Sequence, residues 1–537
     1  MSVLHPELVI RGAIVLAATP AGLETAEAVA IGGGRVLATG DRDVVGEPAG
    51  ARLIDVGDAA VIPGLHDFHI HLVDLARSTR AVVFNDDPDG RAVAARLASA
   101  AVEVPLDAWV RGRGWSDAQV AGMTDALEEA VAGRRAYLMS HDGHSAWASA
   151  AARRLAGLHA NTPDPDGGRI ERDAHGEPTG FLRERAMDIV ASLVSRLQGD
   201  DLRQPLDETL RRLAGLGITG ASEAGDYTDR NGIGSDADLG DSASSLTDLG
   251  AMIDGRLRLS IGLPADAIPA VIARGLWTGA PVAGRQTMRI GWAKHYTDGA
   301  LGSGTAALFA PDGDLGILRV GPERLSADAD LARPAGIGLA LHAIGDRAVA
   351  VALDALEHAP ARQQNAALDR LEHVQLLRPE DASRFDRIGV VASVQPIHAA
   401  ADRDLVEERW ADRAVDAYAW RRLAEHGAIL AAGSDAPVES VNPWLGCYAA
   451  VHRAFPSDAR GPWRPDQSLT MAEALSAYTL APARALGMAD EGHLRVGARA
   501  DVAVLSADLA TLLKADESLG DVHSVMTIVN GREVLRT

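Results

Sequence analysis

The chain has 537 residues, of which 47% are hydrophobic and 23% are charged, and its mean hydropathy is close to zero. This composition is typical of globular proteins and excludes long disordered regions. Asp and Glu number 74 against 52 Lys and Arg, which gives a net charge of −22. So acidic a chain is a poor non-specific binder of nucleic acid or of an anionic membrane, and we expect neither as a partner.

Cys447 is the only cysteine, which excludes an intrachain disulfide and a cysteine-based zinc site. No apolar run reaches the roughly 18 residues that cross a bilayer. The apolar stretch Ala13–Thr19 follows Glu7 and Arg11 and lacks a basic leader, so we interpret it as a strand and not as a signal peptide. We therefore expect a cytoplasmic protein.

Both ends of the chain contain short β-type runs separated by Gly and Asp turns. The runs are Leu8–Leu16, Ala28–Ile31, Arg35–Thr39, Ala51–Val56, Asp501–Leu505, Val525–Val529 and Glu533–Leu535. Asn530-Gly531 between the last two runs is a hairpin signal. We predict one small β-sandwich domain built from residues 1–60 and 485–537. Two unrelated β appendages are the alternative.

The middle of the chain alternates short apolar runs with longer helical patterns, which indicates βα units and a parallel sheet. The predicted strands are Val61–Leu65, Gly217–Ser222, Leu257–Leu263, Met288–Ala293, Ile337–Leu341, Asp369–His373, Gly389–Val394 and Ala428–Gly433. Eight strands are the number that closes a (β/α)₈ TIM barrel, predicted here over residues 61–484. This count treats residues 75–210 as a large insertion after barrel strand 1, and residues 226–248 as a surface loop.

Side chains that bind metals follow several of these strands. His69 and His71 end the first strand, and residues two apart in an extended chain point the same way. Because the carboxyl ends of all barrel strands open onto one mouth, we expect them to converge with the residues that end strands four, five, six and eight. Those residues are Lys294, His342, His373 and Asp435. Imidazole and carboxylate ligands without thiolate suit zinc or a similar divalent ion.

Each of these residues alone has a more ordinary interpretation. A histidine after a strand is more often packed or hydrogen-bonded than a metal ligand. Asp435 could cap a helix that starts in Ser-Asp-Ala-Pro, and a lysine such as Lys294 is usually solvated. The joint pattern favours a metal site, because all six residues stand at strand ends of one barrel.

The set resembles the pattern of the amidohydrolase superfamily, which is a His-x-His motif, a lysine after strand four, two histidines and a late aspartate. More narrowly, the chain is similar to amidohydrolase family 3, the group of YtcJ-like proteins and N-substituted formamide deformylases. The supporting stretches span nearly the whole chain: Val61–His71, Asp142–Trp147, Thr162–Ile170, Glu177–Leu182, Asp298–Ala307, Gln395–His398, Gly433–Glu439, Asn442-Pro443 and Leu469–Ala483.

By this resemblance, one or two divalent ions, with zinc as the expected metal, are held by His69, His71, Lys294, His342, His373 and Asp435. The first two histidines bind one ion and the later two bind the other. The lysine is carboxylated by CO₂, and its carbamate bridges both ions as a bidentate oxygen ligand. The aspartate ligates the first ion and hydrogen-bonds the bridging water.

The chain departs from this group in two places. Gly304 stands where the group often has an arginine, in Ser-Arg-Thr-Ala, so an arginine that positions substrate or a loop is missing. His295 and Tyr296 follow the lysine, where apolar residues are usual. Both departures bear on the substrate more than on metal binding.

The predicted reaction is hydrolysis of a non-peptide C–N bond in an amide, formamide or cyclic amide. A metal-bound hydroxide attacks the carbonyl carbon, and Asp435 is the general acid and base. With one ion only, His373 or His342 would polarise the carbonyl in its place. The alternatives are C–O hydrolysis, a metal-dependent lyase or isomerase reaction on the same site, and a non-catalytic barrel scaffold.

Candidate substrate contacts lie in the insertion and in loops at the barrel mouth. They are Trp115, His144, Trp147, Asp298, Gln395 and His398. Asp298 has the alternative role of orienting the loop that follows Lys294. Aromatic side chains beside a polar cluster suit a pocket for a hydrophobic amide substituent. The alternative for both tryptophans is that they only pack the insertion onto the barrel. The expected partner is a small-molecule substrate, and we also expect a homodimer.

Overall fold

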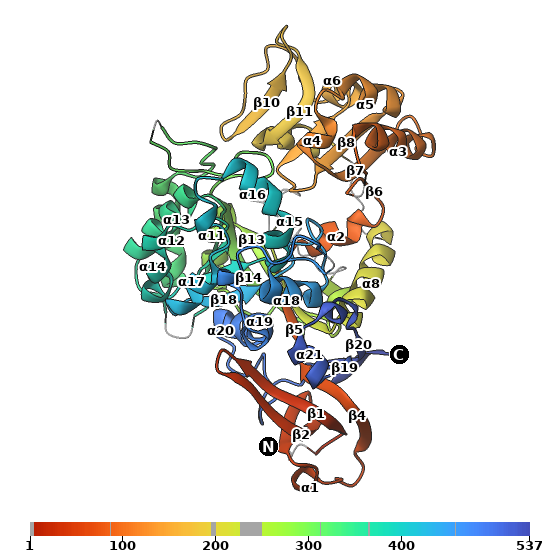
Figure 1. Ribbon diagram of the computed structural model, residues 1–537, viewed down its shortest axis with the longest axis vertical. Coiled ribbons are helices and arrows are strands. Elements are labelled where there is room, and N and C mark those ends of the chain that lie inside the picture. Colours follow the sequence, from red (N-terminus) through yellow and green to blue (C-terminus); the bar gives the residue numbers. More distant parts are fainter. Residues whose placement is uncertain are drawn as a thin grey trace.

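A computed structural model describes residues 5–85, 87–194, 200–225, 250–311, 313–363, 366–456 and 458–537. The predicted surface loop at 226–248 lies outside the described residues. Figure 1 shows three stacked parts: a β-rich body made by the two ends of the chain, a central barrel, and an insertion on the opposite side of the barrel. In the part of the chain that the structure describes, no helix combines the length and the apolar character that crossing a membrane requires.

Both ends of the chain contribute to one seven-stranded sheet. Its order is β21-β20-β19-β4-β1-β2-β3. The strands are β1 (Leu8–Thr19), β2 (Gly22–Gly32), β3 (Arg35–Gly40), β4 (Arg52–Pro63), β19 (Val502–Asp508), β20 (Ser524–Val529) and β21 (Arg532–Arg536). The short helices α1 (Arg42–Val45) and α21 (Leu509–Lys514) flank it. One apolar cluster contains Ile31 of β2 and Ile528 of β20, so the two ends of the chain share a core.

The predicted (β/α)₈ barrel is confirmed. Its eight strands form a parallel sheet in the order β18-β17-β16-β15-β14-β13-β12-β5. They are β5 (Leu65–Ile70), β12 (Ile218–Glu223), β13 (Arg258–Pro264), β14 (Met288–Tyr296), β15 (Leu339–Ala343), β16 (Arg370–His373), β17 (Val391–Val394) and β18 (Ile429–Ala432).

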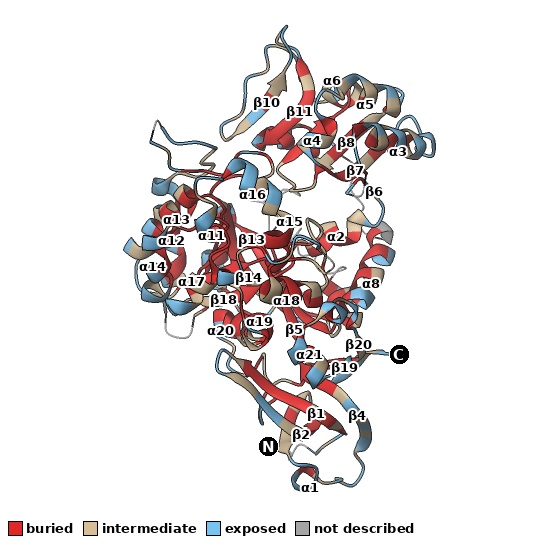
Figure 2. Ribbon diagram, viewed as in Figure 1, coloured by how far each residue is buried: buried red, intermediate tan, exposed pale blue. Residues whose placement is uncertain are grey.

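The barrel closes where the first strand meets the loop after the last. The amide of Asp435 donates to the carbonyl of His69 at 2.7 Å, and the amide of His71 donates to the carbonyl of Ala436 at 2.9 Å. Figure 2 shows the barrel strands as the buried centre of the molecule. The closure therefore places His69, His71 and Asp435 beside one another at the mouth.

The first barrel strand is displaced from its prediction. Val61 and Ile62 belong to β4 of the terminal sheet, where Ile62 pairs with Ala503, and the barrel strand starts only at Leu65. Gly64 makes the transition, because a Cβ there would lie 2.0 Å from the hydroxyl of Thr219. The apolar run Val61–Leu65 thus crosses the boundary between two sheets, which hydrophobicity alone does not mark.

Helices surround the barrel and fill the space between its strands and solvent. They are α2 (Leu72–Ser78), α8 (Asp200–Gly215), α11 (Ile268–Ala273), α12 (Pro322–Ala332), α13 (Asp346–His358), α14 (Ala382–Ile388), α15 (Pro396–Ala401), α16 (Arg403–Arg409), α17 (Trp420–Glu425), α18 (Pro443–His452), α19 (Met471–Ala477) and α20 (Leu480–Leu486). Cys447 of α18 is fully buried and packs in the core.

The insertion has its own six-stranded sheet, in the order β10-β11-β9-β8-β7-β6. The strands are β6 (Val82–Val83), β7 (Trp109–Trp115), β8 (Arg135–Ser140), β9 (Ser145–Ala148), β10 (Gly168–Arg172) and β11 (Pro178–Glu184), with helices α3 (Gly90–Val102), α4 (Asp117–Val120), α5 (Thr124–Val131), α6 (Ala150–Leu155) and α7 (Asp188–Ala191). Apolar residues of α2 and α8 belong to the barrel core, so the part that folds apart from the barrel is shorter than residues 75–210.

Candidate metal centre and active-site cavity

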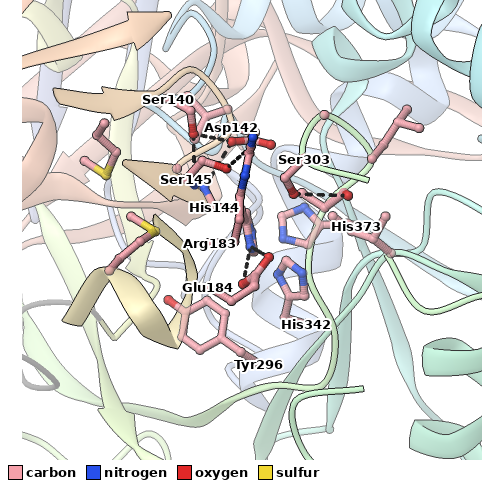
Figure 3. A pocket seen from close by; sticks show the side chains of 18 of the residues that line it. Ser140, Asp142, His144, Ser145, Arg183, Glu184, Tyr296, Ser303, His342 and His373 are labelled. Atoms are coloured by element: carbon pink, nitrogen blue, oxygen red, sulfur yellow. Dashed lines mark hydrogen bonds and ion pairs between the residues drawn. The ribbon is translucent and has the colours of Figure 1, made fainter. Parts of the chain in front are cut away.

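A cavity of about 1320 Å³ lies between the barrel mouth and the insertion. All six residues predicted as metal ligands line it, namely His69, His71, Lys294, His342, His373 and Asp435. Figure 3 shows how the two parts face each other across it: His144 and Glu184 of the insertion point toward His342 and His373 of the barrel. The insertion therefore forms one wall of the site.

The tightest ligand group is His69, His71 and Asp435. Oδ1 of Asp435 lies 2.9 Å from Nε2 of His71 and 3.3 Å from Nε2 of His69. Burial alone would raise the pKa of Asp435, but the two histidines hold it well below its usual range. Asp435 has a φ of 58°, a left-handed conformation that is uncommon for a residue with a side chain and clusters at functional sites.

A buried carboxylate stands behind the first of these ligands. Oε2 of Glu372 lies 2.5 Å from Nδ1 of His69, and Oε1 lies 2.7 Å from Nε of Arg370. Burial would raise the pKa of Glu372, but the charges of Arg370 and His69 lower it. Because Nδ1 of His69 donates to this carboxylate, the lone pair of Nε2 is left for an ion. Sequence reasoning missed Glu372, although it directly precedes His373.

A second ligand group consists of His373, His398 and Asp435. Nε2 of His398 lies 3.7 Å from Oδ2 of Asp435, and Nδ1 of His373 lies 3.9 Å from the same oxygen. The rings of His373 and His342 are 4.6 Å apart between centroids. The sequence analysis predicted His398 as a substrate contact. The structure groups it with two of the candidate metal ligands, His373 and Asp435. Burial lowers the pKa of both His342 and His373, which keeps these imidazoles neutral.

Lys294 is buried in the cavity wall at the carboxyl end of β14. Its ammonium lies 4.9 Å from the ring centroid of Tyr296, and its charge lowers the pKa of His342 and of His373. The two unusual residues after the lysine, His295 and Tyr296, are both among the residues that line the cavity. His295 also lies 3.0 Å from Asp328 of α12.

Glu184 joins the insertion to the barrel inside the cavity. Its carboxylate lies 3.0 Å from Nδ1 of His144, and it accepts hydrogen bonds from Thr305 at 2.6 Å and from Arg319 at 3.0 Å. The residue is buried and has a φ of 51°. His144 lies 5.1 Å from His342 between ring centroids, so this network reaches the predicted second ion. Sequence analysis found His144 but not Glu184, whose partners are distant in the chain.

The six candidate substrate contacts divide into two groups. Trp115, His144 and His398 line the cavity. Trp147, Asp298 and Gln395 are buried behind it and are not among its lining residues in the described part of the chain. Trp147 packs in the apolar core of the insertion, so the packing alternative describes its position.

Asp298 and Gln395 act through their neighbours. Asp298 accepts hydrogen bonds from the amides of Ala307, Ile344 and Gly345, and burial raises its pKa to about 7. It therefore ties the loop after β14 to the loop after β15. Oε1 of Gln395 lies 2.8 Å from Nδ1 of His373 and orients that ring.

An arginine occupies the space beside Gly304. A Cβ on Gly304, whose φ is 66°, would lie 3.2 Å from Nη1 of Arg409. Arg409 ends α16, lines the cavity and donates to the carbonyl of Leu301 at 2.7 Å. A guanidinium thus lies beside Gly304, at the loop where the family resemblance leads us to expect an arginine.

The donor set fits a divalent ion. Nε2 of His69 and Nε2 of His398 are buried, have no hydrogen-bond partner among the described residues, and both face Asp435. Unpartnered imidazole nitrogens beside an ionised carboxylate are unfavourable without an ion, and imidazole with carboxylate is a usual ligand set for zinc and its neighbours. The site therefore meets the requirements of a divalent-metal centre.

Comparison with known proteins identifies the family. A family model described as amidohydrolase family matches residues 52–535. The chain belongs to this family, and the prediction of a metal-dependent amidohydrolase, an enzyme acting on carbon–nitrogen bonds other than peptide bonds, is confirmed.

Individual relatives are distant but match along the chain. The putative amidohydrolase YtcJ of Bacillus subtilis is 29% identical and covers 95% of this chain and 96% of its own. The N-substituted formamide deformylase of Arthrobacter pascens is 27% identical and covers 94% of each chain. A solved structure of an uncharacterized metal-dependent hydrolase from Pyrococcus horikoshii is 25% identical, covers 93% of this chain and 97% of its own, and has a TM-score of 0.72.

Proposed function

We propose that the protein hydrolyses the C–N bond of a small N-substituted amide, formamide or cyclic amide, with zinc at the barrel mouth. The observation that carries this proposal is the cluster of His69, His71 and Asp435, with its unpartnered imidazole nitrogen, at the base of a large cavity. The similarity to an N-substituted formamide deformylase supports this class of substrate.

His69, His71 and Asp435 would hold the first ion, and Lys294, His342 and His373 would hold the second. A bound divalent ion lowers the pKa of a water molecule and polarises a carbonyl group. The carboxylate of Asp435 would accept the proton of the attacking water and deliver it to the leaving nitrogen. Its position supports this role, because both ligand groups share this one carboxylate.

Lys294 would contribute as a carbamate formed with CO₂. The unmodified ammonium repels cations, whereas the carbamate is an anionic oxygen ligand. The position of Lys294 supports this proposal, because it is buried in the wall of the cavity that the histidines also line. The charge of Lys294 acts on both His342 and His373, whose ring centroids are 4.6 Å apart, and this proximity also supports the proposal.

The test uses the zinc-loaded enzyme and a panel of N-substituted formamides and acetamides. We expect release of amine and of the carboxylic acid, with one ¹⁸O incorporated into the acid from labelled water. Products without ¹⁸O would indicate a lyase or isomerase reaction. Protein that stays metal-free after incubation with zinc, or zinc-loaded protein that cleaves no C–N bond in the panel, would contradict the proposal.

A further inference from the structure

Arg113 is a buried cation to which neither the metal centre nor the proposed reaction assigns a role. It lies near the carboxyl end of β7 in the insertion, lines the cavity, and is 7% exposed. Its guanidinium has no hydrogen bond and no ion pair with any residue in the described part of the chain. Burial lowers the pKa of Arg113 to about 10, although three carboxylates attract it.

Those three carboxylates already have closer partners. They are Asp74, Asp435 and Glu439. Asp74 lies 3.1 Å from Arg77, Asp435 lies 2.9 Å from His71, and Glu439 lies 3.0 Å from His141. Arg113 therefore has no carboxylate within ion-pair distance among the described residues, although three act on it from further away. Such a charge costs stability unless something binds it, and proteins retain that kind of cost at functional sites.

The surroundings of Arg113 favour a carboxylate as that ligand. A planar guanidinium donates two parallel hydrogen bonds to a carboxylate, which matches a single arginine to a single negative charge. A doubly charged phosphate is disfavoured, because Asp74, Asp435 and Glu439 surround the same space. Trp115, two residues further along β7, also lines the cavity, and its indole nitrogen is already bonded to the carbonyl of Leu138. Its ring packs against Phe181 in the apolar core of the insertion.

We propose that Arg113 binds a carboxylate on the amine side of the substrate, so that the substrate class is N-acylated amino acids with an apolar spacer. This inference rests on the proposed hydrolysis of an N-substituted amide. The scissile carbonyl would lie at the candidate metal ligands, the carboxylate at Arg113, and the spacer in the cavity between them. Arg113 is thus a specificity-determining residue contributed by the insertion, which explains why the cavity has an insertion wall.

The experiment compares N-formyl-ω-amino acids of increasing chain length with the matched terminal amides, which are neutral. For the wild-type enzyme we expect kcat/KM to favour the acid at one chain length by about 10- to 100-fold, the worth of a hydrogen-bonded charge pair. Arg113→Met should abolish this preference, mainly by raising KM for the acids. Arg113→Lys keeps the positive charge but not the planar guanidinium. Its preference for the acid should lie between those of the wild type and Arg113→Met.

Arg111→Met is the matched control. Arg111 lies on the same strand two residues away and is not among the residues that line the cavity. Its replacement should leave the preference for the acid intact. Arg113→Met should also melt at the wild-type temperature or above it, because a buried unpaired charge is removed, whereas a purely structural arginine would lower the melting temperature.

The outcomes separate this inference from the proposed hydrolysis. Cleavage of the neutral amides without any preference for acids, or equal losses on acids and amides in Arg113→Met, would overturn the role of Arg113 and keep the hydrolase. A preference for the matched phosphonates over carboxylates would also overturn it. If no amide is cleaved, thermal stabilisation by N-formyl-6-aminohexanoate is measured instead. Stabilisation of the wild type but not of Arg113→Met supports the carboxylate site. If neither protein is stabilised, the proposed carboxylate site is wrong.

Discussion

Nδ1 of His69 lies 2.5 Å from Oε2 of Glu372, and that carboxylate is paired on its other side with Arg370. The guanidinium of Arg370 in turn lies over the rings of Phe68 and Trp292. A metal-ligating histidine is commonly oriented by a carboxylate in this way, which fixes its tautomer and raises its basicity. The orientation of one ligand thus depends on a chain of contacts that runs through the centre of the barrel.

Glu372→Gln should therefore weaken zinc binding by about 10- to 100-fold, because the neutral amide no longer holds the imidazole as a strong donor. Competition with a zinc chelator measures this change. Glu357→Gln is the control, since Glu357 forms an ion pair with Arg384 away from the cavity. Wild-type zinc affinity in Glu372→Gln would show that His69 is oriented without the carboxylate.

Asp435→Asn tests the proton transfer. Asparagine keeps the shape of the side chain but cannot accept the proton of the attacking water, so we expect kcat to fall by at least about 100-fold with the fold retained. Circular dichroism checks the fold, and elemental analysis checks how much zinc remains. A variant that keeps near-wild-type turnover would remove Asp435 from the mechanism.

Glu184 provides a test of how the insertion is attached. Its carboxylate bonds to His144 on one side and to Thr305 and Arg319 on the other, all within the cavity. Glu184→Gln leaves the two cations without their counter-charge, which should lower the free energy of unfolding by about 3–5 kcal/mol. Urea denaturation measures this change.

Glu171→Gln is the matched control for this prediction. Glu171 pairs with Arg183 near the surface of the same insertion sheet, and Arg183 keeps a second carboxylate in Asp117. Its loss should change the free energy of unfolding by no more than about 1 kcal/mol. If Glu184→Gln and Glu171→Gln had equal small effects, the buried network would not stabilise the contact between insertion and barrel.

We predict that Arg409 takes the place of the arginine that the family resemblance leads us to expect at position 304. Arg409→Met should lower kcat/KM by about tenfold, because the loop carbonyl of Leu301 loses a charged donor. The double variant Gly304→Arg with Arg409→Met should recover part of the loss. Recovery is incomplete because a side chain at a φ of 66° costs about 1 kcal/mol. No recovery would show that the two positions are not interchangeable.

The convergence of the six candidate ligands on one cavity was predictable, because it follows from one rule of the fold. Parallel barrel strands end at one mouth, so residues such as His342 and His373, far apart in the chain, could be placed together from their position after apolar runs. The hairpin at Asn530-Gly531 was also predictable, because this dipeptide favours a tight turn between two strands. The structure pairs β20 with β21 on either side of it.

Other features were not predictable because they depend on how separate parts dock. Glu184 and Arg113 enter the site only when the insertion lies over the barrel, and no periodicity in the sequence encodes that placement. The start of the first strand was displaced because one apolar run, Val61–Leu65, serves two sheets. The sequence left open whether Asp298 orients the loop after Lys294 or touches substrate, because its three backbone amide donors come from residues that only the fold brings to it.

Lys294→Ala provides the test of the proposed carbamate. The variant should bind one zinc ion fewer per chain than the wild type, measured by elemental analysis, and should lose activity, because the anionic bridge between the two ion positions is gone. Truncation leaves space in the buried wall beside Tyr296, His342 and His373. Formate or acetate can enter that space and supply the missing oxygen ligands, so either acid should restore activity and zinc content in part. Ammonium or methylamine should not restore them. Rescue by an amine, or an unchanged zinc content, would show that Lys294 acts as a cation and not as a carbamate.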